Sequence, residues 1–155
     1  MFNHGINVVG LFLVADILEK RLKTRDITTM GGIASKAPIF ALLSFILVCG
    51  AMAVPLTNGF PGELLLLKSV FTYNAWLGAF AGLTIIFCAV YMLRIFQLVM
   101  FGGTKPSTEH FEEVNSIEGV SLGIVAFFVV ILGIFPQSIL DMSGSAVKSF
   151  LGFVG

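Results

Sequence analysis

Residues 54–67 read VPLTNGFPGELLLL, and this stretch decides how the chain folds. Pro55 and Pro61 interrupt a helix because proline lacks a backbone N–H and its ring clashes with the preceding turn. Glu63 follows at once and opens a run of leucines, where a charged side chain is costly. The stretch therefore predicts a helix that breaks over residues 54–61 and resumes with a carboxylate in its first turn. The residues expected to form the break are Pro55, Thr57, Asn58, Gly59 and Pro61.

Two interpretations of Glu63 follow from these residues. Irregular backbone at membrane depth is tolerated only where it is buried in protein or lines a cavity, and a titratable group beside such a break suits a proton or ion path. Alternatively, the stretch is a loop at the membrane surface and Glu63 stabilises the start of the next helix, where acidic residues are common. The residues alone leave both interpretations open.

Composition places the chain in a membrane. Its 155 residues are 57% hydrophobic and 12% charged, with a mean hydropathy of +0.99. A soluble domain carries about 25% charged residues. We therefore expect an all-α, polytopic membrane helix bundle that forms one unit over residues 1–155. The formal net charge of zero gives no reason to expect a nucleic-acid partner.

The sequence carries no recognisable cofactor motif. It has no P-loop, no Gly-x-Gly-x-x-Gly and no metal-ligand spacing of cysteines, so we expect no metal or cofactor in this chain. Cys49 and Cys88 each lie in an apolar stretch and are interpreted as small core residues. The first residues lack the basic region of a signal peptide. The chain opens inside an apolar helix, which suggests a piece of a longer protein.

Hydropathy predicts the membrane segments. The apolar segments cover residues 2–18, 39–54, 62–73, 76–101 and 117–135. Segments 39–54 and 62–73 are interpreted as halves of one broken helix, with a re-entrant hairpin as the alternative. The first segment is short for a span of about 20 residues and counts as a partial crossing. With the broken helix and two whole spans, four crossings are expected.

Charge and amphipathicity orient these segments. The connection over residues 19–37 holds five of the nine basic residues, which predicts a cytoplasmic location for it. After Pro136, residues 137–154 alternate apolar and polar side chains, which predicts an amphipathic helix lying at the membrane surface. An even number of crossings places both ends of the chain on the outer side.

Three more polar residues lie in apolar segments. His4 and Asn7 are three residues apart and share a helix face. Histidine can relay protons because its ordinary pKa is about 6.5, although composition alone favours a neutral, hydrogen-bonded side chain. Lys68 lies five residues after Glu63, about 140° round a helix. We therefore expect no direct pair; Lys68 extends toward the interface or belongs to a charge path.

Several short motifs together resemble one family. They are Asn3-His4-Gly5, Leu11-Phe12-Leu13, Lys23-Thr24-Arg25-Asp26, Gly31-Gly32 with Pro38, residues 54–64, Tyr91-Met92-Leu93 and Phe101-Gly102. The pattern is similar to the C-terminal part of the antiporter-like proton-translocating subunits of respiratory NADH:quinone oxidoreductase (complex I), above all those of the subunit M (chain 4) type. These subunits are built as inverted repeats, a plan common among transporters.

The resemblance implies a function and a set of site residues. Glu63 would be the terminal proton site, His4 would lie on the hydrophilic axis, and Asn7 and Lys68 are candidates for the polar path. Lys68, Pro61 and Asp16 depart from the family pattern. The chain would hold only the exit half of a proton channel. Alternatives are a subunit of a cation/proton antiporter or membrane hydrogenase, and a structural assembly segment without a titrating role.

The resemblance also implies the surroundings of the chain. NADH, flavin, iron–sulfur clusters and quinone are expected in partner subunits, with no redox chemistry in this chain. The expected partners are other membrane subunits of the same complex and the lipid bilayer. The expected location is the bacterial inner membrane, which the chain would cross several times.

Overall fold

The fold is all-helical over the part of the chain that the computed structural model describes, which is residues 1–137, 140, 141, 144, 149, 150 and 152. The helices are α1 (Phe2–Leu22), η1 (Ile27–Thr29), α2 (Ile33–Lys36), α3 (Pro38–Ala51), α4 (Phe60–Tyr73), α5 (Ala75–Met100) and α6 (Ser116–Ile134). This confirms the predicted fold class, a membrane helix bundle with one broken helix. The amphipathic helix predicted for residues 137–154 lies largely outside the described residues.

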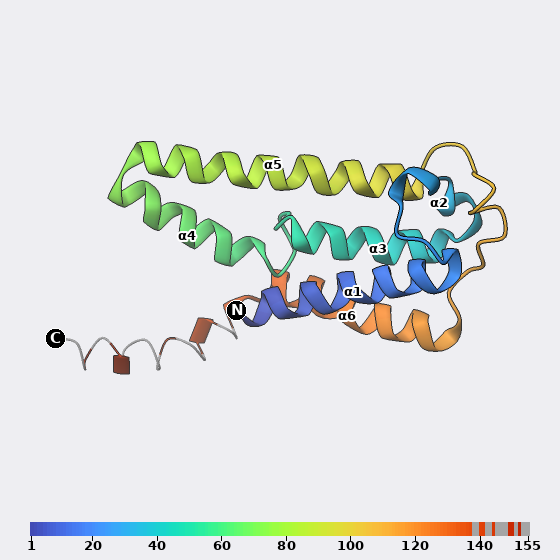
Figure 1. The fold of residues 1–155 in the computed structure, drawn as a ribbon. Helices are drawn as coiled ribbons and strands as arrows, with labels where there is room; N and C mark the ends of the chain where they lie inside the picture. The colour runs from blue at the N-terminus through green and yellow to red at the C-terminus, as the bar shows by residue number, and fades with distance from the viewer. Residues whose placement is uncertain (138–139, 142–143, 145–148, 151, 153–155) are drawn as a thin grey trace.

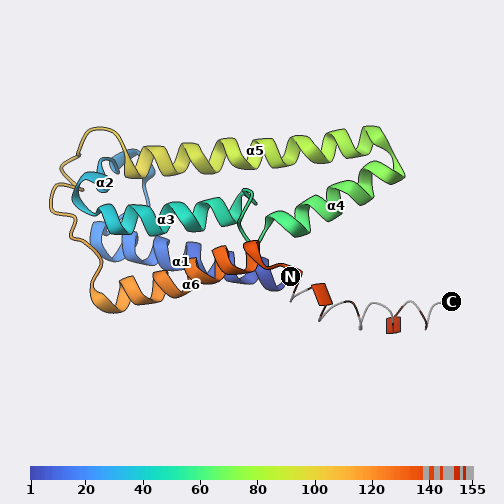
Figure 2. The ribbon, with the colours of Figure 1, turned by 180° about the vertical axis from the view of Figure 1, so that it is seen from behind.

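The helices divide into a packed group and a projecting hairpin. Helices α1, α3 and α6 pack against one another, and α4 continues away from them beyond the end of α3 (Figure 1). Helix α5 then runs back along α4 and α3 (Figure 2). Gly78 allows the tight turn of this hairpin, because a Cβ at that position would lie 2.5 Å from the Phe71 ring.

Helix α1 is longer than the sequence predicted. It has 21 residues, or roughly 31 Å at 1.5 Å per residue, instead of ending near residue 18. Lys20 donates to Asp16 over 2.6 Å one turn earlier. The helix ends at Leu22, and the next residue, Lys23, has a left-handed backbone (φ 55°). The segment predicted from hydropathy was therefore too short, and α1 is long enough for a whole crossing. Helices α1, α5 and α6 are each long and apolar enough to cross a membrane, whereas α3 is shorter.

The break between α3 and α4 covers residues 52–59. Helix α3 ends three residues before the predicted position, because Ala53 adopts a left-handed backbone (φ 52°) that a helix cannot contain. Leu56 is left-handed as well (φ 76°). The prediction that Pro61 lies in the break was wrong: it lies in the first turn of α4, where its missing N–H costs no hydrogen bond.

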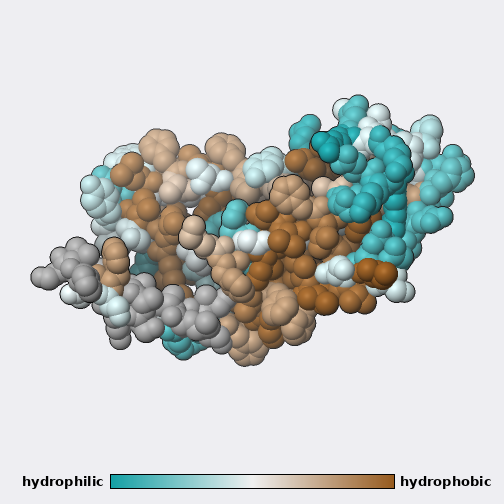
Figure 3. Space-filling view, turned by 60° about the horizontal axis from the view of Figure 1, so that its bottom comes forward, coloured by the Kyte–Doolittle hydropathy of each residue, from teal (hydrophilic) through white to brown (hydrophobic). Residues whose placement is uncertain are grey.

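The two long loops gather at one end of the bundle, here called the polar end (residues 23–37 and 101–115). Figure 3 shows hydrophilic side chains concentrated at one end and hydrophobic side chains over much of the remaining surface. Large apolar side chains such as Phe80, Ile86 and Phe87 are exposed along α5. Apolar surface of this extent is what lipid or neighbouring chains cover.

The Glu113 carboxylate accepts hydrogen bonds from the first turn of α3. One carboxylate oxygen accepts from the N–H of Ile39 (2.9 Å) and the other from the N–H of Phe40 (3.0 Å). These are N–H groups that a helix start leaves without intrahelical partners. The loop before α6 thus caps α3 from 74 residues away in sequence.

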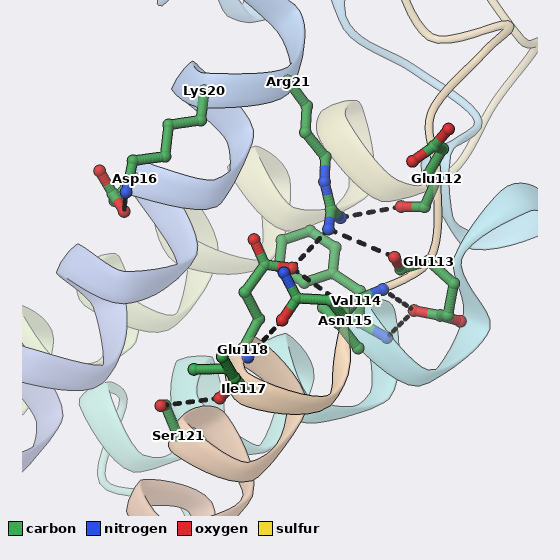
Figure 4. Close-up of polar contacts among 11 residues, drawn as sticks. Asp16, Lys20, Arg21, Glu112, Glu113, Val114, Asn115, Ile117, Glu118 and Ser121 are labelled. Carbon is green, nitrogen blue, oxygen red and sulfur yellow. Dashed lines mark hydrogen bonds and ion pairs between the residues drawn. The ribbon is translucent and has the colours of Figure 1, made fainter.

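Arg21 joins the same loop to the end of α1. Its guanidinium forms an ion pair with Glu118 and donates to the carbonyl oxygens of Glu112 (2.8 Å) and Glu113 (3.2 Å), as Figure 4 shows. It also lies 5.1 Å from the centre of the Phe111 ring. Because Glu118 and Asn115 form a capping box at the start of α6, this one arginine ties together α1, α6 and the loop that caps α3.

Candidate functional site

Asparagine side chains of α1 bind the broken helix. The amide nitrogen of Asn3 donates to the carbonyl oxygen of Asn58 over 2.6 Å, and that of Asn58 donates to the carbonyl of Asn3 over 3.2 Å. The amide of Asn7 donates to the carbonyl of Gly50 over 2.9 Å, near the end of α3. Helix ends leave such carbonyls without intrahelical partners. Helix α1 therefore stabilises backbone groups that the break has freed.

The break also binds within itself and to α6. The Thr57 hydroxyl donates to the carbonyl of Val54 over 2.7 Å. The N–H of Asn58 donates to the carbonyl of Val129 in α6 over 2.9 Å. Thr57 and Asn58 are both buried, with Asn58 fully inaccessible. Buried peptide groups require such partners. The irregular stretch finds them within itself, in α1 and in α6.

Glycines let the backbones around the break approach closely. A Cβ on Gly133 of α6 would overlap the carbonyl group of Leu56. A Cβ on Gly59 would lie 2.9 Å from the carbonyl oxygen of Gly50, and one on Gly50 would lie 2.7 Å from a Val129 methyl group. Larger residues at these three positions would force α6 and the two halves of the broken helix apart.

A pocket of about 560 Å³ opens beside the break, between α1, α4 and α5. It is lined by His4, Asn7, Asn58, Glu63 and Tyr91, among others. Asn7 is buried at 6% exposure, whereas His4 and Glu63 are exposed in the described chain. The structure therefore brings His4 and Glu63 to the walls of one pocket, although they are distant in sequence and lie on different helices.

Glu63 also lines a second pocket of about 390 Å³ between α4 and α5, together with Thr84 and Cys88. Glu63 thus lines two neighbouring pockets, and Leu66 is the other residue that they share. Lys68 lines neither of them; it lies with Ser69 and Thr72 near the α4–α5 turn. Lys68 and Glu63 thus line different pockets, in agreement with the angle of about 140° between their positions round a helix.

Asn3 and Tyr91 belong to this site, although no role was predicted for either of them. Asn3 precedes Asn7 by one turn, so the i,i+4 repeat of asparagines on an apolar helix was the available signal. Gly133 carried no local signal, because its importance comes from the Leu56 carbonyl that it faces across the bundle.

A membrane helix bundle with a helix broken beside a pocket that titratable side chains line is the arrangement found in many transport proteins. Residues 1–89 match the family described as NADH:quinone oxidoreductase/Mrp antiporter, TM. The match covers more than half of the chain, and the chain belongs to this family. The predicted resemblance is confirmed.

Curated relatives carry the name NADH-quinone oxidoreductase subunit M. The protein from Rickettsia conorii is 36% identical over 152 residues, which is 97% of this chain and 31% of the relative. The protein from Mycobacterium tuberculosis is 32% identical over 156 residues, covering all of this chain and 28% of the relative. The chain thus spans about a third of the length of these relatives.

Solved structures share the fold. Respiratory complex I from Thermus thermophilus with bound NADH matches with a TM-score of 0.83 and 28% identity, over 99% of this chain and 32% of the other. The Mrp complex from Dietzia sp. matches with a TM-score of 0.81 over 93% of this chain and 35% of the other. Its 18% identity supports the fold alone.

Proposed function

We propose that this chain contributes the exit half of a proton-translocation channel to a membrane subunit of NADH:quinone oxidoreductase. The observation that carries the proposal is the pocket at the helix break, which His4 and Glu63 line together. The name of the curated relatives supports the choice of complex. Electron transfer, with NADH, flavin, iron–sulfur clusters and quinone, would take place in other subunits of a bacterial inner-membrane assembly.

In this proposal Glu63 is the group that loads and releases the proton. A proton arriving in the break pocket from the side of His4 binds a Glu63 carboxylate oxygen. It leaves toward the second pocket, which Thr84 and Cys88 line between α4 and α5. Water bridges polar groups that are too far apart to touch, so His4 and Glu63 need no direct hydrogen bond. The asparagine contacts of α1 hold the break beside this pocket.

The test is NADH-driven acidification by inverted membrane vesicles that contain the complete complex. Glu63→Gln removes the titrating group at nearly constant size, so proton translocation should fall sharply while the complex still assembles. Glu63→Asp keeps the acid and should be milder. Glu109→Gln is the matched control, because Glu109 is an exposed carboxylate at the polar end. Normal translocation by Glu63→Gln would reduce Glu63 to a residue that stabilises the start of α4.

A second candidate is a subunit of a cation/proton antiporter, because the family includes Mrp antiporters. The same vesicles separate the two possibilities. A respiratory subunit moves protons when NADH is supplied, whereas an antiporter dissipates an imposed proton gradient when Na⁺ or K⁺ is added. Exchange that depends on the cation and not on NADH would favour the antiporter.

A further inference from the structure

A separate pocket of about 370 Å³ lies at the polar end, between the last turns of α5 and the loops that follow η1 and α5. Its charged lining residues are both cations, Arg94 of α5 and Lys105 of the following loop. Gln97 adds a side-chain amide. The pocket shares no lining residue with the pockets at Glu63.

The donors in this pocket are largely free. Within the described part of the chain, Arg94 has no ion pair and no side-chain hydrogen bond. The Lys105 ammonium donates to the carbonyl of Thr28, which leaves two of its three N–H groups. The N–H groups of Gly102 and Gly103 likewise donate to no acceptor among the described residues. The pocket thus offers positive charge and several donors to an anion of matching size.

Apolar side chains border the same pocket. Leu98 follows Arg94 at i+4 on one face of α5, and Phe101 is the first residue after that helix. Both side chains are more than half exposed. Arg94 lies six residues before the end of the helix, or roughly 9 Å at 1.5 Å per residue. That distance places Arg94 near the boundary between hydrocarbon and headgroups when α5 spans the membrane.

We propose that this pocket binds the phosphate of an anionic phospholipid. Arg94 and Lys105 would bind the headgroup phosphate, the N–H groups of Gly102 and Gly103 would add hydrogen bonds, and acyl chains would lie along Leu98 and Phe101. Basic pockets beside membrane helices recognise anionic headgroups by this combination of charge and apolar contact. A free phosphate ion would leave the apolar side of the pocket without a partner, so the lipid is the better fit.

Photocrosslinking in the intact complex tests this site. The complex that contains this chain is delipidated in mild detergent and placed in nanodiscs with diazirine-labelled phosphatidylglycerol or phosphatidylcholine. Mass spectrometry then measures the labelled fraction of the peptide spanning residues 95–105. We expect several-fold more labelling with the anionic lipid. Arg94→Gln should lower that labelling about fivefold, as the loss of one cation near the surface predicts, whereas Arg94→Lys should retain most of it.

Arg25→Gln is the control for charge removal, because Arg25 lies at the polar end and pairs with Glu19 away from the pocket. Its labelling should match that of the unaltered complex. Equal labelling by the two lipids, or an equal loss in Arg25→Gln, would overturn the proposal. Complete competition by millimolar inorganic phosphate would also contradict it, because the site would then recognise a free anion. If Arg94→Gln fails to assemble, the comparison of the two lipids in the unaltered complex still decides the question.

Discussion

Asn3 and Asn58 each donate a side-chain hydrogen bond to the carbonyl oxygen of the other, over 2.6 and 3.2 Å. This reciprocal pair joins the first turn of α1 to the break between α3 and α4. Each side-chain amide nitrogen donates to a backbone carbonyl oxygen, so neither side-chain amide can flip without losing its hydrogen bond. The pair therefore fixes where the break lies relative to the helix that carries His4.

Asn58→Ala should destabilise the protein by about 1–3 kcal/mol, because it removes the hydrogen bond from the Asn58 amide to the Asn3 carbonyl and leaves space at a fully buried position. The effect is measured by thermal unfolding of the purified complex, in which the unfolding of this chain is monitored. Gln97→Ala is the control, because Gln97 is an exposed amide without a side-chain hydrogen bond among the described residues. Equal stability of the two variants would show that the reciprocal pair contributes little.

Gly133→Ala should cost about 1–3 kcal/mol, because the new methyl group would overlap the Leu56 carbonyl and force α6 away from the break. Gly123→Ala in the same helix meets nothing within 4 Å and should be neutral or stabilising by up to about 1 kcal/mol. Denaturant unfolding compares the two. A Gly133→Ala protein as stable as Gly123→Ala would contradict the close contact between α6 and the break.

Glu113 should make the stability of α3 depend on pH. Burial acts to raise the pKa of Glu113, but hydrogen bonds from the N–H groups of Val114, Ile39 and Phe40 and the charge of Arg21 outweigh it, so the pKa is lowered. A lowered pKa in the folded state means that the stabilisation is complete above the unfolded value of about 4.3. It is lost as the pH falls through the folded pKa.

The melting temperature measured against pH tests this dependence. Glu113→Gln should lower stability at neutral pH, by about 0.5–2 kcal/mol as for the loss of other helix caps. It should also make the melting temperature fall less as the pH is lowered. Glu109→Gln is the control at an exposed loop carboxylate. An unchanged acid profile in Glu113→Gln would remove Glu113 as the cap of α3.

Cysteine labelling from each side of the membrane tests the orientation. The loops of the polar end are bound to each other, for example through the Thr108 hydroxyl and the Gly31 carbonyl (2.6 Å). Ser35→Cys and Glu109→Cys should therefore react from the same side, the cytoplasmic one by the bias of basic residues. Tyr73→Cys, at the α4–α5 turn, should react from the other side. Reaction of all three from one side would exclude a single crossing by the broken helix.

The sequence predicted the break but not its details. Pro55 acts locally, so its effect on a helix can be read from its own chemistry. The same reasoning failed for Pro61, which α4 accepts in its first turn. The left-handed backbone of Ala53 has no such signal. The break packs against α1 and α6, and that packing depends on residues far away in the sequence.

Among the side chains, too, local patterns were predictable and contacts between distant residues were not. His4 and Asn7 were placed on one face of α1 by helical spacing, and the structure places both at the pocket beside the break. Their environments differ, since Asn7 is buried and bound to Gly50 while His4 is exposed. The cap that Glu113 provides for α3 spans 74 residues of sequence. Short-range patterns carry no information about a contact of that kind.

The central claim is that His4 and Glu63 belong to one proton path, and a double-mutant comparison tests it most directly. The rate of NADH-driven proton translocation is measured for His4→Gln, Glu63→Gln and the double variant in vesicles that contain the complete complex. Residues that act in one path give strongly non-additive effects. We therefore expect the double variant to be no slower than the slower single variant. Losses that multiply in the double variant, or a His4→Gln protein with unchanged translocation, would contradict a path shared by the two residues.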